Sequence, residues 1–230
     1  MERKPKNTHK TTTLSMENKE LSKQLCAVFN LKGITSKCFV HRVECILVGL
    51  TFVKVPCRDY KLFFTIYPLW RSTLKSCIDV PLLLQPLVDD NGLDIYLSDS
   101  TNIIDRCSTQ FPLLSGSNIA ADFVRGLYEI IATDKSIQTN FVLQMKIYEL
   151  IYGIAHYLNN IKIAKDVYIQ ISNQISGWDT KIFNYWYGDK DTTLTKLLEF
   201  ESNKRRIVKN IGRNAYDPKV IKLPTYKFLV

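Results

Sequence analysis

The sequence predicts an α+β fold: a small antiparallel sheet in the N-terminal half, packed against a helical C-terminal half that ends in a basic tail. Three observations lead to this prediction. Apolar residues alternate with period two between residues 39 and 97, as they do in half-buried strands. Turn-forming segments at 56–59 and 89–92 separate the extended segments, which favours antiparallel neighbours. From Ser117 onward the apolar spacing changes to 3.6 residues, the period of a helix.

The first half is expected to begin with an amphipathic helix and to continue as a hairpin or three-stranded meander. In chain order we expect a helix over 16–30, extended segments over 39–48 and 50–55, a strand over 60–67, one helical turn over 80–86 and a strand over 93–97. Gly49 predicts a bend or a bulge between the two extended segments. Residues 101–117, which contain Pro112 and Gly116, are expected to form a connecting loop.

The second half is expected to consist of helices. The spacing predicts helices over 119–130, 141–155, 164–175, 178–187 and 192–211. The helix over 141–155 is apolar on two sides, which predicts a central position in the core. Gly212 is expected to terminate the last helix at the C′ position, and the last eighteen residues are expected to be extended.

The predicted domain organisation has four parts. They are a disordered basic extension over 1–15, an α+β subdomain over 16–116, a helical subdomain over 117–212 and a basic extended tail over 213–230. The sequence leaves open whether the two subdomains share one core or are two closely docked domains.

The net charge of +9 is concentrated at the two ends of the chain. Residues 1–15 carry +3 and residues 204–230 carry +7, which leaves −1 on the long segment between them. Because the body is close to neutral, we expect any electrostatic attraction to be local rather than spread over the whole surface.

Several classes of protein are disfavoured. No stretch approaches the ~18 to 20 apolar residues of a membrane span, and no secretory signal pattern follows the basic start, so a cytoplasmic protein is expected. The six cysteines form no CxxC pair, which removes the usual zinc signatures, and we expect them to be small buried hydrophobes. No glycine-rich phosphate-binding motif occurs, and therefore no cofactor and no metal are expected.

The sequence contains no evident catalytic pair, so the protein is expected not to be an enzyme. His41 and Cys45 share a strand face in the predicted extended segment, but residues four apart on a strand are roughly 13 Å apart, beyond hydrogen-bonding reach. His156, near the end of a helix, is expected to be an ordinary core or surface residue. A weaker hypothesis remains, in which Cys57 or Asp94 meets His41 through the fold.

Acidic residues gather in the middle of the chain, at Asp79, Asp89, Asp90, Asp94, Asp99 and Asp105. Such a cluster is one requirement of a metal-dependent nuclease, but the Glu-x-Lys partner that normally follows is missing after Asp94. We therefore interpret these residues as turn-forming and solvated loop acids.

The segment 178–187 is denser in aromatic rings than one amphipathic helix needs. Large rings cap a core, and they also anchor protein interfaces. The candidate partner-binding residues are Trp178, Phe183, Tyr185, Trp186 and Tyr187.

Cations follow this segment. The candidate contacts for phosphates or for an acidic partner are Lys204, Arg205, Arg206, Lys209 and Arg213. The alternative is that these cations complement the dipole of the helix that precedes them and are otherwise solvated. No helix-turn-helix, zinc-finger or RNA-recognition signature accompanies them.

These features lead to two functional hypotheses. The first is a non-enzymatic interaction protein, an accessory, adaptor or immunity-type subunit, whose helical half docks on a protein partner through the aromatic residues and the cations together. The alternative is a DNA- or RNA-binding protein whose basic C-terminal segment contacts phosphates.

Overall fold

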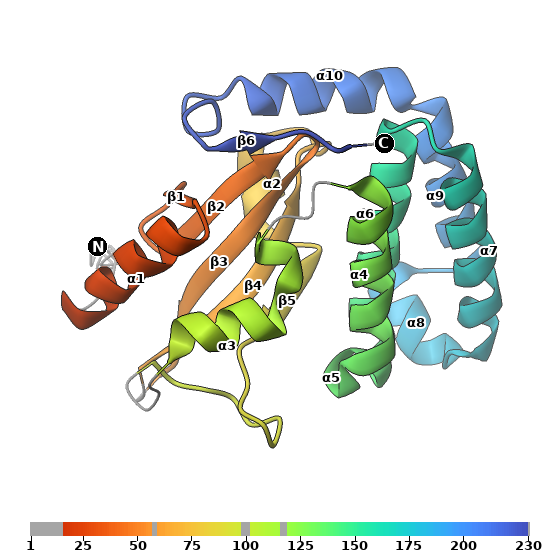
Figure 1. Cartoon of the computed structure of the whole chain (residues 1–230). Helices are drawn as coiled ribbons and strands as arrows, with labels where there is room; N and C mark the ends of the chain where they lie inside the picture. Colours follow the sequence, from red (N-terminus) through yellow and green to blue (C-terminus); the bar gives the residue numbers. More distant parts are fainter. Residues whose placement is uncertain (1–15, 57–58, 98–101, 116–118, 230) are drawn as a thin grey trace, which may run out of the picture.

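The computed structural model describes residues 16–56, 59–97, 102–115 and 119–229, and its fold is α+β, as the sequence predicts. Figure 1 shows the sheet on one side of the molecule and most of the helices on the other, with helix α10 lying across the end of both. The predicted extension over 1–15 lies outside the described residues, and so does the predicted boundary between residues 116 and 117.

The described strands form one sheet in the order β1-β2-β3-β4-β5, in which all neighbours are antiparallel. Strand β6, from near the C-terminus, adds to β2 in parallel. The strands are β1 Lys32–Gly33, β2 Cys38–Val43, β3 Ile46–Lys54, β4 Tyr60–Pro68, β5 Leu83–Pro86 and β6 Thr225–Tyr226.

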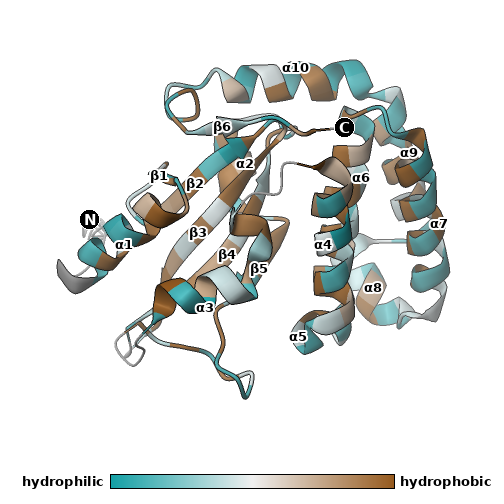
Figure 2. Cartoon of the chain, viewed as in Figure 1, coloured by the Kyte–Doolittle hydropathy of each residue, from teal (hydrophilic) through white to brown (hydrophobic). Residues whose placement is uncertain are grey.

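The central strands are covered on both faces. Residues 46 to 50 of β3 and 64 to 68 of β4 are all buried, although successive side chains on a strand point to opposite faces. Layers of other elements must therefore lie on both sides of the sheet. Figure 2 shows the matching hydropathy, with apolar colour along these strands and polar colour on the outward sides of the helices.

The helices follow the expected order in the second half. They are α1 Met16–Val28, α2 Leu74–Asp79, α3 Ile103–Gln110, α4 Ala120–Thr133, α5 Lys135–Gln138, α6 Phe141–Tyr157, α7 Ile161–Gly177, α8 Thr180–Tyr187, α9 Lys190–Ser202 and α10 Lys204–Ala215. Asparagine and aspartate side chains cap α5, α6, α7, α8 and α9 at their N-termini, which fixes where these helices begin. None of the helices that the structure describes has the length and the apolar character needed to cross a membrane.

Helix α6 occupies the predicted central position, since ten of its residues are buried. At Gly153 it closely approaches Trp70, which lies two positions after the end of β4. A Cβ atom on Gly153 would lie 2.6 Å from two ring atoms of Trp70, so only glycine leaves room for the indole. The same indole meets Phe200 of α9 edge to face, with ring centroids 5.8 Å apart. Trp70 thus packs between the sheet, α6 and α9.

Helix α10 is fastened to the same segment by hydrogen bonds. The buried Asn214 donates through Nδ2 to the carbonyl oxygens of Leu69 and Arg71, each at 2.8 Å, and Asn210 donates to that of Trp70 at 3.0 Å. These bonds satisfy carbonyl groups that no sheet neighbour reaches. One continuous hydrophobic cluster consequently runs from α1 through the sheet to α10.

The first predicted strand is wrong in its bounds, because it spans a hairpin turn. Val43 pairs with Ile46, so Glu44 and Cys45 form a two-residue turn in which Glu44 takes the left-handed φ of 43°. Neither residue is typical of such turns, and so the sequence carries no signal for it. Gly49 causes no bend; it allows close approach, because a Cβ there would lie 2.1 Å from a carbonyl oxygen of β2.

Three other segments between residues 80 and 115 differ from the prediction. The expected helical turn over 80–86 is the edge strand β5, an edge position that tolerates its terminal proline. The expected strand over 93–97 makes only isolated bridges at Asp94 and Tyr96. The expected loop over 101–117 contains helix α3 and a 3₁₀ turn at Pro112–Ser115, whose apolar stripes are too short to stand out in the sequence.

The expected helix over 192–211 is two helices. The helix is interrupted at Asn203, which lies between α9 and α10. Helix α10 then continues through Gly212 to Ala215, so Gly212 is an interior residue of a helix. The predicted boundary between residues 212 and 213 falls inside this helix. After α10, turns lead to β6, so the expected extended tail is only partly extended.

Candidate functional site

Three of the five candidate aromatic residues pack against the core, Phe183 fully and Trp178 and Tyr187 in part. Phe183 is fully buried, and its ring stacks on Tyr187 at 5.4 Å and on Trp178 at 6.0 Å. Phe141 of α6 stacks on Trp178 at 5.4 Å, and the Tyr187 hydroxyl donates to the Val142 carbonyl at 3.1 Å. These three rings attach α8 to α6, which leaves Phe183 inaccessible and only part of Trp178 and Tyr187 exposed.

The other two candidates are on the surface of α8. Tyr185 is 81% exposed and Trp186 is 60% exposed, and their rings meet edge to face at 5.4 Å. Ile182, one turn earlier, is 52% exposed. Because residues three and four apart share a helix face, Ile182, Tyr185 and Trp186 form one apolar surface, which we call the α8 patch.

Four of the five candidate cations share the solvent face of α10. Helical residues are offset by about 100° each, and the buried residues of this helix define the opposite side. We call Arg205, Arg206, Lys209 and Arg213 the α10 cations. No carboxylate among the described residues forms an ion pair with them, and α10 itself contains no acid. The fifth candidate, Lys204, is half-buried and donates to the Asn159 side chain.

The α8 patch and the α10 cations do not form one continuous surface. Helix α9 separates them, and its 13 residues span about 20 Å. In Figure 1, α8 lies at the lower end of this helix and α10 at the upper end. A single compact patch with aromatic anchors and a surrounding basic rim is therefore absent from these elements.

A cleft of about 530 Å³ lies beside α10, where the β4–α2 loop, α6 and α9 also meet. We call it the α10 cleft. Two of the α10 cations, Arg206 and Arg213, line it, together with Arg71 of the loop and Lys196 of α9. Arg71 and Lys196 could not be predicted from the sequence, because both lie outside the basic segment 204–230 and neither stands in a motif.

An acid lies among these cations. Glu149 of α6 lines the α10 cleft, and burial raises the pKa of its carboxyl, while Arg71, Lys146 and the Trp70 indole act in the opposite direction. The indole N–H of Trp70 is buried and has no acceptor in hydrogen-bonding geometry. The lining of the cleft therefore includes one buried polar group, the Trp70 indole N–H, that has no partner in hydrogen-bonding geometry within the described protein.

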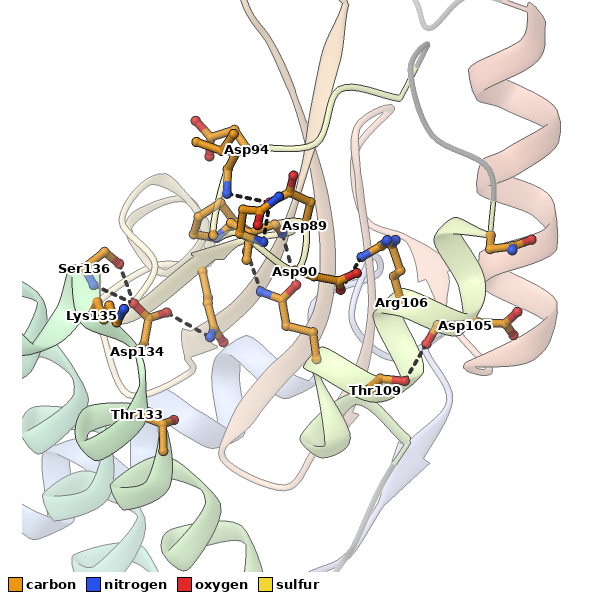
Figure 3. Close-up of a pocket in the computed structure, with 18 residues that line it drawn as sticks. Asp89, Asp90, Asp94, Asp105, Arg106, Thr109, Thr133, Asp134, Lys135 and Ser136 are labelled. Atoms are coloured by element: carbon orange, nitrogen blue, oxygen red, sulfur yellow. Dashed lines mark hydrogen bonds and ion pairs between the residues drawn. The ribbon is translucent and has the colours of Figure 1, made fainter.

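A larger cleft of about 1060 Å³ lies at the other end of the sheet, between the turn after β5, α3 and the α4–α5 junction. Figure 3 shows Asp89, Asp90 and Asp94 between Arg106 on one side and Asp134 on the other. We call it the acidic cleft.

Most acids of the acidic cleft already have structural partners. Asp89 accepts the N–H groups of Asn91 and Leu93, which lowers the pKa of Asp89 and closes the turn. Asp90 pairs with Arg106, and Asp94 pairs with Lys61. Within the described chain, no group of three or more His, Cys, Asp or Glu side chains is placed to hold a metal ion. Asp99 lies outside the described residues.

Of the two histidines that the structure describes, neither forms a hydrogen bond with a cysteine, serine or threonine side chain, although Ser108 and Ser115 line the same pocket as His41. His41 is 2% exposed, and Tyr226 covers its ring at 5.0 Å with an edge-to-face contact. Its Nδ1 has no partner, and neither has Nε2 of His156, which lies against Tyr152 and Phe200. Asp94 pairs with Lys61 instead of His41, and Cys57 lies outside the described residues.

The described cysteines are free, and four of these five thiols are buried. Burial raises the pKa of Cys107 to about 12 and that of Cys77 to about 11, so these thiols stay protonated at neutral pH. They behave as small core residues.

No protein-family model, no curated protein and no solved structure matches this chain. The functional inference therefore depends on the surfaces described above.

Because His41 is buried, we expect the free energy of unfolding of the protein to fall in acid. Burial lowers the pKa of His41 from 6.5 to about 4. Between these pH values the unfolded chain binds a proton that the folded chain does not, so the free energy of unfolding should fall by up to about 3 kcal/mol as the pH falls. Urea unfolding of the wild type and of His41→Gln between pH 7 and pH 4 measures this, and the variant should lose less stability.

His156→Gln serves as the control for this measurement. Burial also lowers the pKa of His156. The variant His156→Gln should therefore lose only the part of the pH dependence of stability that comes from His156, and retain the part that comes from His41. Equal pH dependence in the wild type and His41→Gln would contradict the assignment.

Proposed function

We propose that this protein is a non-enzymatic interaction protein that docks on a protein partner through the α8 patch. The observation that carries the proposal is the exposure of Tyr185 and Trp186 side by side on a helix whose other face is fixed in the core. Tyrosine and tryptophan are the residues most enriched among interface positions that dominate binding. A cytoplasmic location is part of the same proposal.

The α8 patch is also rigid, which favours its use as an anchor. Asp179 caps α8 by accepting the N–H of Ile182 at 2.9 Å, and the buried ring of Phe183 holds the helix against α6. The two exposed rings restrict each other through their edge-to-face contact. A surface that is already ordered loses little conformational entropy when it binds.

The double variant Tyr185→Ala with Trp186→Ala tests this proposal. Removing two anchors of this kind should weaken the partner complex by at least about 2 kcal/mol. Because both side chains are exposed, the melting temperature should remain close to that of the wild type. The measurement is quantitative affinity capture from the native host, followed by titration of the recovered partner against purified wild type and variant.

A matched control removes apolar side chains of similar exposure elsewhere. Ile169 on α7 is 55% exposed and Tyr216 after α10 is 78% exposed, so Ile169→Ala with Tyr216→Ala should retain the partner. The proposal is wrong if the α8 double variant and this control bind the partner equally well.

A second function, nucleic-acid binding through α10, is supported by a separate observation. The α10 cations lie on one exposed face and have no carboxylate partner among the described residues, as a phosphate-binding helix requires. This candidate does not involve the α8 patch, and so the two can be tested independently.

The salt dependence of binding tests this second function. If Arg205 and Lys209 each contact one phosphate of duplex DNA, Arg205→Ala with Lys209→Ala should reduce the slope of log affinity against log salt by about 1.8. The measurement is fluorescence anisotropy of a labelled duplex at several salt concentrations. Absence of DNA and RNA binding by the wild type at about 50 mM salt would eliminate this function.

A further inference from the structure

The α10 cleft contains more positive than negative charge, and its four cations come from three separate elements. Arg71 lies on the β4–α2 loop, Lys196 on α9, and Arg206 and Arg213 on α10, while the acids that line the cleft are Glu149 and Glu199. Segments distant in the chain therefore converge to make this site, which distinguishes it from a basic stretch on one helix.

Two of these cations are fixed in place without losing charge. Arg71 donates from Nη1 to the carbonyl oxygens of Ser76 and Val80, and Arg213 donates from Nη2 to the carbonyl of Ser72. Carbonyl acceptors are neutral, so each guanidinium keeps its full positive charge and its remaining N–H donors. Such pre-positioned donors are suited to an anion with several oxygen atoms.

The other two cations are free to reach a ligand. Arg206 and Lys196 are exposed at the mouth of the cleft, and no carboxylate in the described parts of the chain forms an ion pair with either. Together with Arg71 and Arg213 they place positive charge on more than one wall of the cleft. Cations on several walls of a cleft suit a compact anion that enters it, whereas cations on one flat surface suit an extended anion that lies along it.

The volume and the apolar lining indicate how large the ligand is. About 530 Å³ is far more than a single phosphate group fills, and Trp70 and Phe200 supply aromatic surface beside the cations. A ligand with a phosphate group and an attached planar or apolar part would use both kinds of lining.

We propose that the α10 cleft binds a phosphate group carried by a small molecule, with Arg71, Lys196, Arg206 and Arg213 as the contacting cations. The partly buried Glu149 and the exposed Glu199 are the unfavourable neighbours, and protonation of Glu149, whose carboxyl lies beside Arg71, removes its share of the repulsion. The site lies at the opposite end of α9 from the α8 patch, so it does not depend on the proposed docking function.

Direct titration of the full-length protein tests the proposal with four probes: inorganic phosphate, adenosine monophosphate, adenosine without the phosphate, and a DNA duplex. Adenosine monophosphate and inorganic phosphate should bind and adenosine should not. Lys196→Ala with Arg206→Ala should weaken binding of both phosphate probes by about tenfold or more, because two charge-assisted contacts are lost. Glu149→Gln should bind them more tightly, which a merely structural role would not produce.

The matched control is Arg205→Ala with Lys209→Ala, which also removes one arginine and one lysine, but from positions on α10 that do not line the cleft. This control should bind adenosine monophosphate as the wild type does. Equal weakening by the two double variants would overturn the proposal, because it would indicate diffuse attraction to a basic surface.

Two other outcomes would also overturn it. One is that neither inorganic phosphate nor adenosine monophosphate binds at millimolar concentration. The other is that only duplex DNA binds, which would leave the α10 cations as a nucleic-acid surface and the cleft without a ligand role. The α8 double variant, Tyr185→Ala with Trp186→Ala, should bind both phosphate probes normally, so failure of the docking function would not be mistaken for failure of this site.

Discussion

The packing of Trp70 is the interaction on which the arrangement of the two halves depends. This residue lies just beyond the end of β4, after Leu69, is 5% exposed, and packs against the backbone of α6 at Gly153 and against Phe200 of α9. Its carbonyl and those of its neighbours accept hydrogen bonds from Asn210 and Asn214 of α10. The short segment 69–71 therefore holds three helices. The Trp70 side chain makes apolar contacts with α6 and α9, and the backbone carbonyls of the segment accept hydrogen bonds from α10.

The candidate binding surfaces follow from this arrangement. Because Trp70 and Phe200 fix α9 against the sheet, the two ends of α9 present different chemistry: the α8 patch at one end and the α10 cations at the other. The α10 cleft is the space that remains beside the Trp70 segment, which explains why loop, α9 and α10 cations meet there. The same packing that makes the core continuous thus separates an apolar surface from a basic one.

The sequence predicted the elements whose signal is local and missed those that depend on distant partners. Helix α6 and strand β4 were readable because each buries a long regular stripe, and α8 was readable from its density of aromatic rings. The turn at Glu44 was not, since neither Glu44 nor Cys45 is typical of a two-residue hairpin turn, and yet Glu44 takes a left-handed conformation there. Likewise the sequence identified the cations of α10, but Arg71 and Lys196 join them only through the fold. The sequence also did not distinguish the exposed rings of Tyr185 and Trp186 from the buried ring of Phe183, because that difference depends on tertiary packing.

The most direct test of this account compares the unfolding free energies of Gly153→Ala and Gly212→Ala in urea. Both substitutions replace a helical glycine and gain similar helix propensity, but a Cβ atom at Gly153 would meet the Trp70 ring at 2.6 Å, whereas one at Gly212 would meet nothing within 4 Å. If Trp70 packed on α6 joins the two halves, Gly153→Ala should be less stable than Gly212→Ala by about 1 to 3 kcal/mol. Equal stability of the two variants would contradict the account.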